Sequence, residues 1–180
     1  NLSVRPRELI ANGIDTAILR ISLMDVNGNP ITIDPSRLSI QTSEDKGTVS
    51  QGQMQPATTH KFTYRAGTSA GEVELWTTLD GNVISERETL SLTPGPGSLQ
   101  RSELRAARDT VFATGTDSTF FTLKLLDENS NEITQGGHNI TVGHSNNVGT
   151  FGPVLDNLDG TYEFTYAAGN GVGDTTVTAY

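Results

Sequence analysis

Residues 62–67, FTYRAG, return 102 positions later as residues 164–169, FTYAAG. In both copies aromatic residues alternate with Thr, and a period of two is typical of a strand with one buried face. Three further blocks repeat at the same spacing: residues 11–15 at 113–117, residues 23–31 at 125–133, and residues 47–48 at 149–150. Blocks that share one register over most of the chain predict two copies of one domain.

Short strands separated by turns run through both copies. Leu19, Ile21 and Leu23 alternate with polar residues, and Gly-rich or Asn-Gly turns follow such strands about every 10 residues. This pattern predicts an all-β fold of two tandem immunoglobulin-like β-sandwich domains. The one helix-like stretch, residues 103–108, aligns with the start of the first copy, so we expect a first strand there or at most one helical turn.

The boundary between the copies is the stretch 93–98, TPGPGS, whose prolines cannot donate to a strand ladder. We therefore predict domains over residues 1–97 and 98–180, with a linker at 93–98. Because this linker is short and stiffened by proline, the domains are expected to lie end to end.

The second domain is expected to lack its last strand. With the spacing of 102, Tyr180 aligns with Thr78, whereas the first copy continues into a predicted strand over residues 84–92. Either the chain was cut inside the domain, or another segment fills the open edge by strand addition. The chain begins at Asn1 rather than Met, so we expect it to be a processed or excised piece of a larger protein.

Composition excludes several classes of protein. The chain has 180 residues, 12 Lys and Arg against 21 Asp and Glu, and a net charge of −9, which repels nucleic acids and anionic lipids. It contains no Cys, which excludes thiolate catalysis and disulfides. No apolar run of about 18 residues occurs. We expect neither a nucleic-acid partner nor membrane insertion of this segment.

Tyr162 carries the clearest fold-specific signal. It follows a turn at residues 158–160 and precedes Phe164 by two positions, as in the tyrosine corner of immunoglobulin-like domains. Its hydroxyl is expected to bond to upstream backbone. The first copy has His60 at the same place, which we interpret as a partly buried residue packed with Phe62 and Tyr64 rather than a catalytic one.

The histidines do not form a catalytic or metal-binding pattern. His138 and His144 flank a predicted strand over residues 139–143 and would lie about 20 Å apart if that strand is extended. No Gly-x-Ser-x-Gly elbow and no paired-His motif is present. The sequence therefore predicts no enzymatic activity and no catalytic residues.

Two acidic loops resemble the opening of a calcium-binding loop, because oxygen-bearing side chains stand at alternate positions. They are Asp25, Asn27 and Asn29 in the first copy, and Asp127, Asn129 and Asn131 in the second. Neither loop has the distal bidentate Glu. The favoured interpretation is a hairpin turn in which Asp and Asn bond to their own backbone, and a calcium site is the alternative. No other cofactor is predicted.

Trp76 is the candidate ligand-binding residue. If Val73 and Leu75 face the core, the alternation places Trp76 on the outer face, where an aromatic side chain can anchor a protein or glycan. The alternative is that Trp76 covers the sandwich surface or packs against the linker or the neighbouring domain.

The repeated blocks resemble the bacterial immunoglobulin-like repeats of the invasin and intimin adhesin family. The residues that carry the resemblance are 11–16, 25–31, 47–48, 62–64 and 71–77, with the second set 102 residues later. This resemblance implies a stalk or spacer segment outside a Gram-negative cell, anchored to the outer membrane through other parts of the protein. Neighbouring immunoglobulin-like domains are its implied partners, and a separate tip attaches to the host cell.

Two other functions remain open at this point. The domains themselves could bind a host-cell surface protein or glycan, through Trp76 or an exposed strand edge. They could also be accessory modules of a secreted carbohydrate-active enzyme or of an S-layer protein, because fold does not fix function. The flanking sequence would separate these alternatives.

Overall fold

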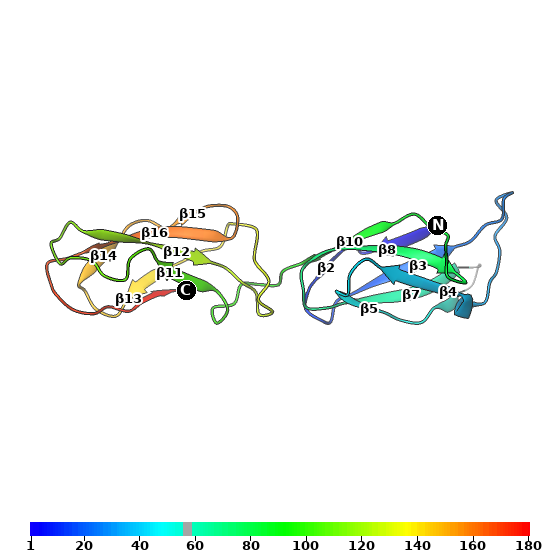
Figure 1. Ribbon diagram of the computed structural model, residues 1–180, viewed down its shortest axis with the longest axis horizontal. Helices are drawn as coiled ribbons and strands as arrows, with labels where there is room; N and C mark the ends of the chain where they lie inside the picture. The colour runs from blue at the N-terminus through cyan, green and yellow to red at the C-terminus, as the bar shows by residue number, and fades with distance from the viewer. Residues whose placement is uncertain (56–58) are drawn as a thin grey trace. The chain divides into compact units, whose positions relative to one another are not determined.

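The computed structural model describes residues 1–55 and 59–180, with side chains described outside residues 54–58. The chain divides into two compact units, Asn1–Gly95 and Pro96–Tyr180, here called unit 1 and unit 2 (Figure 1). Each unit is built from two β-sheets, and the described helical structure is a single 3-10 turn, η1 (Pro35–Arg37). The predicted pair of immunoglobulin-like β-sandwiches is confirmed. Within the described ranges, no helix is long and apolar enough to cross a membrane.

Unit 1 has two five-stranded sheets. The first has the order β1-β3-β7-β5, with β6 also paired to β7, and the second has the order β2-β10-β8-β4, with β9 paired to β8. The strands of the first sheet are β1 (Leu2–Arg5), β3 (Thr16–Ser22), β5 (Gly47–Val49), β6 (Gln53–Gln55) and β7 (Thr59–Ala66). Those of the second are β2 (Glu8–Ile10), β4 (Leu38–Thr42), β8 (Gly71–Leu79), β9 (Asn82–Val83) and β10 (Glu88–Thr93).

The core of unit 1 lies between these sheets. Along β7 every second side chain is buried, from His60 through Phe62 and Tyr64 to Ala66. The facing sheet contributes Leu90 and Leu92 of β10, which are 0% and 2% exposed. Strand β10 is parallel to β2 and antiparallel to β8, so it fills the centre of its sheet.

Unit 2 repeats part of this arrangement. Its first sheet has the order β11-β12-β16-β14, with β15 also paired to β16, and its second sheet pairs β13 with β17. The strands are β11 (Glu103–Ala106), β12 (Ser118–Lys124), β13 (Val142–His144), β14 (Gly149–Phe151), β15 (Leu155–Asp156), β16 (Thr161–Ala168) and β17 (Val177–Ala179). Shifted by 102 residues, they correspond to β1, β3, β4, β5, β6, β7 and β8. Among the described strands of unit 2, none corresponds to β2, β9 or β10.

The structure refines two strand predictions. Residues 103–106 form β11, a strand rather than a helical turn. The single strand expected over residues 84–92 is wrong, because β9 ends at Val83 and β10 begins at Glu88. The break follows from Ser85, whose hydroxyl accepts a hydrogen bond from the Thr77 N–H at 2.8 Å in place of a backbone carbonyl.

The repeated block at residues 11–15 and 113–117 is a loop held by its aspartate. Asp15 Oδ2 accepts the N–H of Ile10 at 3.1 Å, and Asp117 Oδ2 accepts the N–H of Phe112 at 2.8 Å. The glycine of each block has a positive φ, 74° at Gly13 and 75° at Gly115, a backbone conformation that favours glycine. The turn requires both the aspartate and the glycine, which explains why both residues recur in the second copy.

The repeated Gly-Thr pair has a packing explanation. A Cβ on Gly47 would collide with the Tyr64 hydroxyl and the Arg65 carbonyl, and a Cβ on Gly149 would collide with the Tyr166 ring. Both tyrosines are buried on the central strand of their sheet. Each glycine thus lets the edge strand β5 or β14 pass over an aromatic ring.

We expect Gly47→Ala to destabilise unit 1 by about 2 kcal/mol, because overpacking against backbone and a buried ring usually costs about 1–3 kcal/mol. Urea unfolding followed by Trp76 fluorescence measures this, since Trp76 is the single tryptophan and lies in unit 1. Thr48→Ala is the matched control, because Thr48 is exposed on the same strand. Equal midpoints for Gly47→Ala and Thr48→Ala would contradict the packing explanation.

Candidate functional site

Trp76 lies on the outer face of β8, as the alternation of that strand indicates. Val73 and Leu75 are 0% exposed, while Trp76 is half-buried. The guanidinium carbon of Arg87 stands 4.5 Å from the centroid of the Trp76 ring. This cation–π contact covers one face of the indole, so part of the ring is already packed within unit 1.

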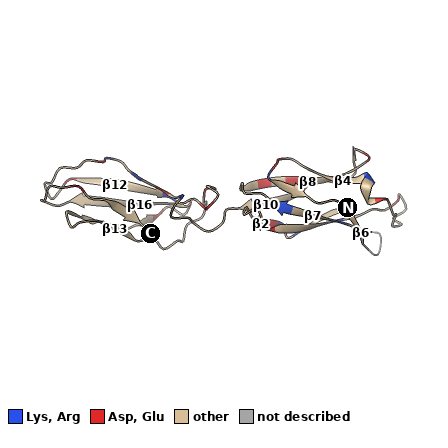
Figure 2. Cartoon of the chain, turned by 90° about the horizontal axis from the view of Figure 1, so that it is seen from below, with Lys and Arg blue, Asp and Glu red and all other residues tan. Residues whose placement is uncertain are grey.

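The surface around Trp76 is charged. Arg87 also forms an ion pair with Glu74 at 2.5 Å, and Glu74 lies on the same face of β8 as Trp76. Acidic residues on β8 are visible in Figure 2. An aromatic ring flanked by charges of both signs can contact a polar protein or a glycan, and it can equally serve as solvated sheet surface.

The Asp25 loop is organised by its own carboxylate. Asp25 Oδ1 accepts the N–H groups of Asn27 at 2.8 Å and Asn29 at 2.9 Å, and Oδ2 accepts the Asn29 side-chain amide at 3.0 Å. The bond from the Asn29 side chain is the largest cause that lowers the pKa of Asp25. Gly28 completes the turn with a φ of 82°.

The Asp127 loop has the same geometry. Asp127 Oδ1 accepts the N–H groups of Asn129 at 2.9 Å and Asn131 at 2.8 Å, and Oδ2 accepts the Asn131 amide at 2.9 Å. Ser130 takes the place of Gly28 with a φ of 67°. In both loops the aspartate caps backbone and amide donors. Across residues 1–55 and 59–180, no three His, Asp or Glu side chains gather into a metal-binding group.

Tyr162 is buried, and its hydroxyl accepts the backbone N–H of His138 at 2.9 Å. The predicted bond to upstream backbone is therefore present, and its partner is 24 residues back in the sequence. The His138 ring meets the Tyr162 ring edge-on, with centroids 6.5 Å apart. His138 thus has a structural contact with the fold's central tyrosine.

The strand expected over residues 139–143 is wrong, because β13 covers only Val142–His144. Beyond β13, Thr141 exchanges two backbone hydrogen bonds with Tyr180. His144 packs on the rings of Phe151 at 5.2 Å and Tyr166 at 6.2 Å. The two histidines therefore contact different tyrosines of β16.

His60 is completely buried, at 0% exposure, rather than partly buried as predicted. In the described structure neither ring nitrogen has a hydrogen-bond partner. Burial lowers the pKa of His60 below its ordinary value of 6.5, because the low-dielectric core disfavours the charged imidazolium. The side chain acts as a neutral core residue in the position that Tyr162 occupies in unit 2.

A groove in unit 2 is the site that reasoning from the sequence did not find. It has a volume of about 860 Å³ and is lined by side chains of β11, β12, β16 and β17 together with residues 108–113 and 171–175. Phe112 is 75% exposed at its edge. Its lining residues are distant in the sequence, from Leu104 to Val177.

Comparison with known protein families shows to which family the chain belongs. The family described as "Invasin, domain 3" matches residues 1–95 and again residues 98–180. The chain belongs to the Invasin domain 3 family. No curated protein matches it.

Solved structures share the fold of this Invasin domain 3 chain over 99% of its length. InvD of Yersinia pseudotuberculosis is 24% identical with a TM-score of 0.66. Invasin, described as a bacterial integrin-binding protein, is 22% identical with a TM-score of 0.70. FdeC, an Escherichia coli adhesin, is 20% identical with a TM-score of 0.64. The chain spans 51%, 36% and 58% of those three chains.

We expect acid to destabilise unit 1 of the Invasin domain 3 chain through His60. Its folded pKa is depressed, so unfolding takes up a proton below the unfolded pKa of about 6.5, and stability is lost as the pH falls from 7 to 5. For one such group the loss is at most about 1.4 kcal/mol for each pH unit below the unfolded pKa. Urea titrations read by Trp76 fluorescence at each pH measure it. In His60→Gln this part of the pH dependence should vanish, and an unchanged slope would contradict the assignment.

We expect millimolar calcium to leave the melting temperatures of the Invasin domain 3 chain unchanged, because Asp25 and Asp127 already accept three hydrogen bonds each from their loops. A ligand that binds only the folded state raises its melting temperature. Differential scanning calorimetry with calcium, and with magnesium at equal ionic strength, tests this. A rise with calcium alone that disappears in Asp25→Asn or Asp127→Asn would establish a calcium site.

Proposed function

We propose that this chain is a non-catalytic stalk segment of a bacterial cell-surface adhesin. The observation that carries the proposal is the tandem match of one family, Invasin domain 3, to residues 1–95 and 98–180. Repetition of one sandwich along a chain makes length scale with copy number. A separate region of the longer protein would then attach to the host cell.

The chemistry of the surface supports a spacer. The net charge of −9 keeps repeated domains soluble and disfavours collapse of neighbours onto each other. In unit 1 the large aromatic residues of β7 are buried in the core between the two sheets. Burial there gives unit 1 stability of its own, which a repeat under mechanical tension requires.

We propose that the segment lies outside a Gram-negative cell, anchored to the outer membrane through parts of the protein beyond these residues. Its constant partners would be the neighbouring immunoglobulin-like domains of the same polypeptide. The similar structures include one described as integrin-binding and one described as an adhesin. Because the chain spans only 36% and 58% of those two, binding to host cells is assigned here to other domains.

The second candidate function is direct binding of a host protein or glycan by unit 1. The half-buried Trp76, flanked by Arg87 and Glu74, is the observation that favours it. Aromatic residues beside charges are common anchors of protein interfaces. Stalk and direct binding make opposite predictions for the isolated chain.

We expect the purified chain, residues 1–180, to show no saturable binding to cultured human epithelial cells, because a stalk has no ligand of its own. Flow cytometry with fluorescently labelled chain measures the binding. Trp76→Ala should behave like the wild type, and Arg87→Ala controls for loss of the covering guanidinium. Saturable submicromolar binding that Trp76→Ala removes, with folding intact by circular dichroism, would overturn the stalk and establish direct binding.

A further inference from the structure

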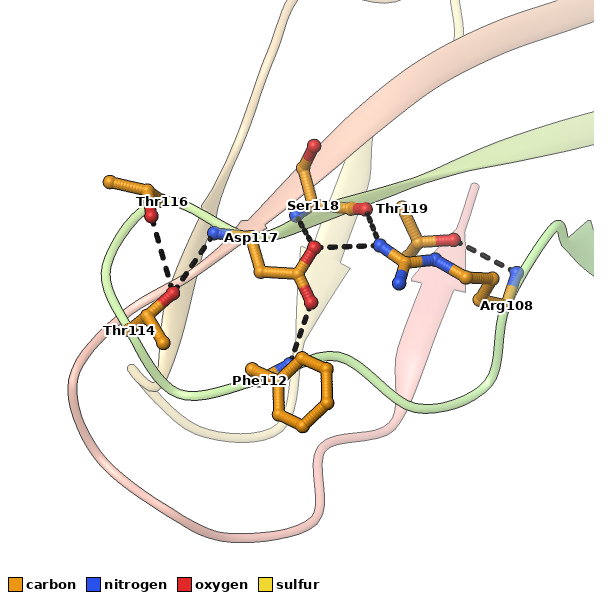
Figure 3. A network of polar contacts seen from close by, with 7 residues as sticks. All are labelled: Arg108, Phe112, Thr114, Thr116, Asp117, Ser118 and Thr119. Atoms are coloured by element: carbon orange, nitrogen blue, oxygen red, sulfur yellow. Dashed lines mark hydrogen bonds and ion pairs between the residues drawn. The ribbon is translucent and has the colours of Figure 1, made fainter.

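Most basic side chains of the protein are paired with a carboxylate. Seven of the 12 Lys and Arg residues form ion pairs, such as Arg108 with Asp117 at 2.7 Å (Figure 3). The other five, which form no ion pair within the described ranges, are Arg5, Arg20, Lys61, Arg65 and Arg101. The first four of these belong to strands β1, β3 and β7, which are neighbours in one sheet of unit 1.

These four cations lie on the outer face of the sheet. The side chains that alternate with them, such as Val4, Leu19 and Phe62, are buried, so the cations point away from the core. The five strands of this sheet contain no Asp or Glu. The outer face of β1, β3 and β7 with its four cations, here called the basic face, is therefore a local positive surface on a chain with a net charge of −9.

Strand register brings the four cations close together. Arg20 lies directly opposite Lys61, and like charges at opposed positions destabilise a sheet. Arg5 pairs with Ile18, which is two residues from Arg20 on the same strand. Arg65 is four residues from Lys61 along β7, a separation of about 14 Å. The arrangement concentrates positive charge at a cost to stability that a bound polyanion would relieve.

The second copy shows that the sandwich does not require these charges. The corresponding residues, 102 positions later, are Ala107, Thr122, Glu163 and Ala167, and none of them is basic. The opposed pair of cations is replaced in unit 2 by Thr122 opposite Glu163. Four cations that repel one another, and that the same sandwich can form without, point to a role in binding rather than in folding.

The positions beside the cations carry hydroxyl or amide side chains. Ser3 lies opposite Arg20, and Gln53 lies opposite Lys61. Thr63 follows Lys61 by two residues on the same face of β7. Guanidinium and ammonium groups donate charge-assisted hydrogen bonds to oxyanions, and hydroxyl and amide groups can bond to the hydroxyls of a sugar. The basic face thus offers donors for both parts of an anionic polysaccharide.

The charge around the basic face favours a narrow ligand. The second sheet of unit 1 carries Glu8, Glu72 and Glu74, so an anionic membrane or a long nucleic acid would also meet negative charge. At physiological salt, charges more than about 8 Å apart are largely screened. A short stretch of a single polysaccharide strand therefore responds to the basic face rather than to the net charge of the chain.

The basic face has no aromatic side chain on which a base could stack. The aromatic residues of β1, β3 and β7 are Phe62 and Tyr64, and both are buried in the core. Proteins that bind single-stranded nucleic acids combine basic grooves with exposed aromatic residues. Because Arg20 and Lys61 are directly opposed, the matching anions must be closely spaced. Sulfate groups on a densely sulfated sugar strand meet that requirement.

We propose that the basic face of unit 1 binds a linear sulfated polysaccharide. The sulfates accept hydrogen bonds from the four cations, and the sugar hydroxyls bond to the neighbouring Ser3, Gln53 and Thr63. Each exposed charge contact is weak, so we expect a dissociation constant of about 0.1–1 mM at 0.15 M salt. Binding of this strength does not saturate at the submicromolar concentrations that would reveal a host-cell receptor.

A heparin hexasaccharide titrated into the isotope-labelled full chain, residues 1–180, tests the proposal by NMR of the backbone amides. At about 0.05 M salt the shifts should saturate and concentrate on β1, β3 and β7. Raising the salt to about 0.15 M should weaken binding about twentyfold, because four cations release counterions from the polyanion. The neutral sugar maltohexaose is the control ligand and should cause no shifts.

Two double variants with the same net charge separate the basic face from general attraction. Arg20→Thr with Lys61→Thr removes the opposed pair, and Arg101→Thr with Arg105→Thr removes two exposed cations from unit 2. The first should weaken hexasaccharide binding about five- to thirtyfold, and the second should leave it unchanged. Thr suits a strand, and the first variant loses a repulsion, so its urea midpoint, followed by Trp76 fluorescence, should not fall.

Several results would overturn the sulfated ligand. They are absence of saturable shifts at low salt, equal weakening in both double variants, and equal affinity for the carboxylated hexagalacturonate. Tighter binding to phosphatidylglycerol vesicles or to oligothymidylate, lost in the first variant, would assign the basic face to a membrane or a nucleic acid instead. Dimers at low salt that the first variant abolishes would assign it to a second copy. None of these outcomes bears on the stalk function, which is read from cell binding.

Discussion

Burial of one face of a central strand, β7 in unit 1 and β16 in unit 2, is the constraint on which both sandwiches depend. The buried aromatic residues of these strands, such as Tyr64 and Tyr166, are large, so the neighbouring edge strand can pass only where it has glycine. The repeated Gly-Thr pair at Gly47 and Gly149 follows from this contact. Core packing thus dictates a sequence feature that first looks like a simple turn signal.

Comparison of the two units distinguishes features held by local hydrogen bonds from features that depend on contacts between distant strands. The loops of Asp15 and Asp117, and those of Asp25 and Asp127, are held by hydrogen bonds within a few residues, and they have the same geometry in both units. Core burial depends on strands far apart in the sequence and differs between the units wherever β10 is involved. Repeated turns therefore identify the fold independently of the contacts between distant strands.

The sequence was sufficient to predict the features that strand alternation and turn-forming residues determine. Period two placed Trp76 on the outer face of β8 and Tyr162 in the core, and the Asx turns of the acidic loops were the favoured interpretation. It could not show that His60 is fully buried without partners, because that depends on the facing sheet. Nor could it show the break at Ser85, where a side-chain hydroxyl replaces a backbone acceptor.

The groove illustrates why the candidate site was harder to predict than the fold. Its lining comes from strands β11, β12, β16 and β17 together with residues 108–113, which are far apart in the sequence. Alternation within a single strand shows which side chains face the core, but it does not show how side chains from distant segments pack around a groove.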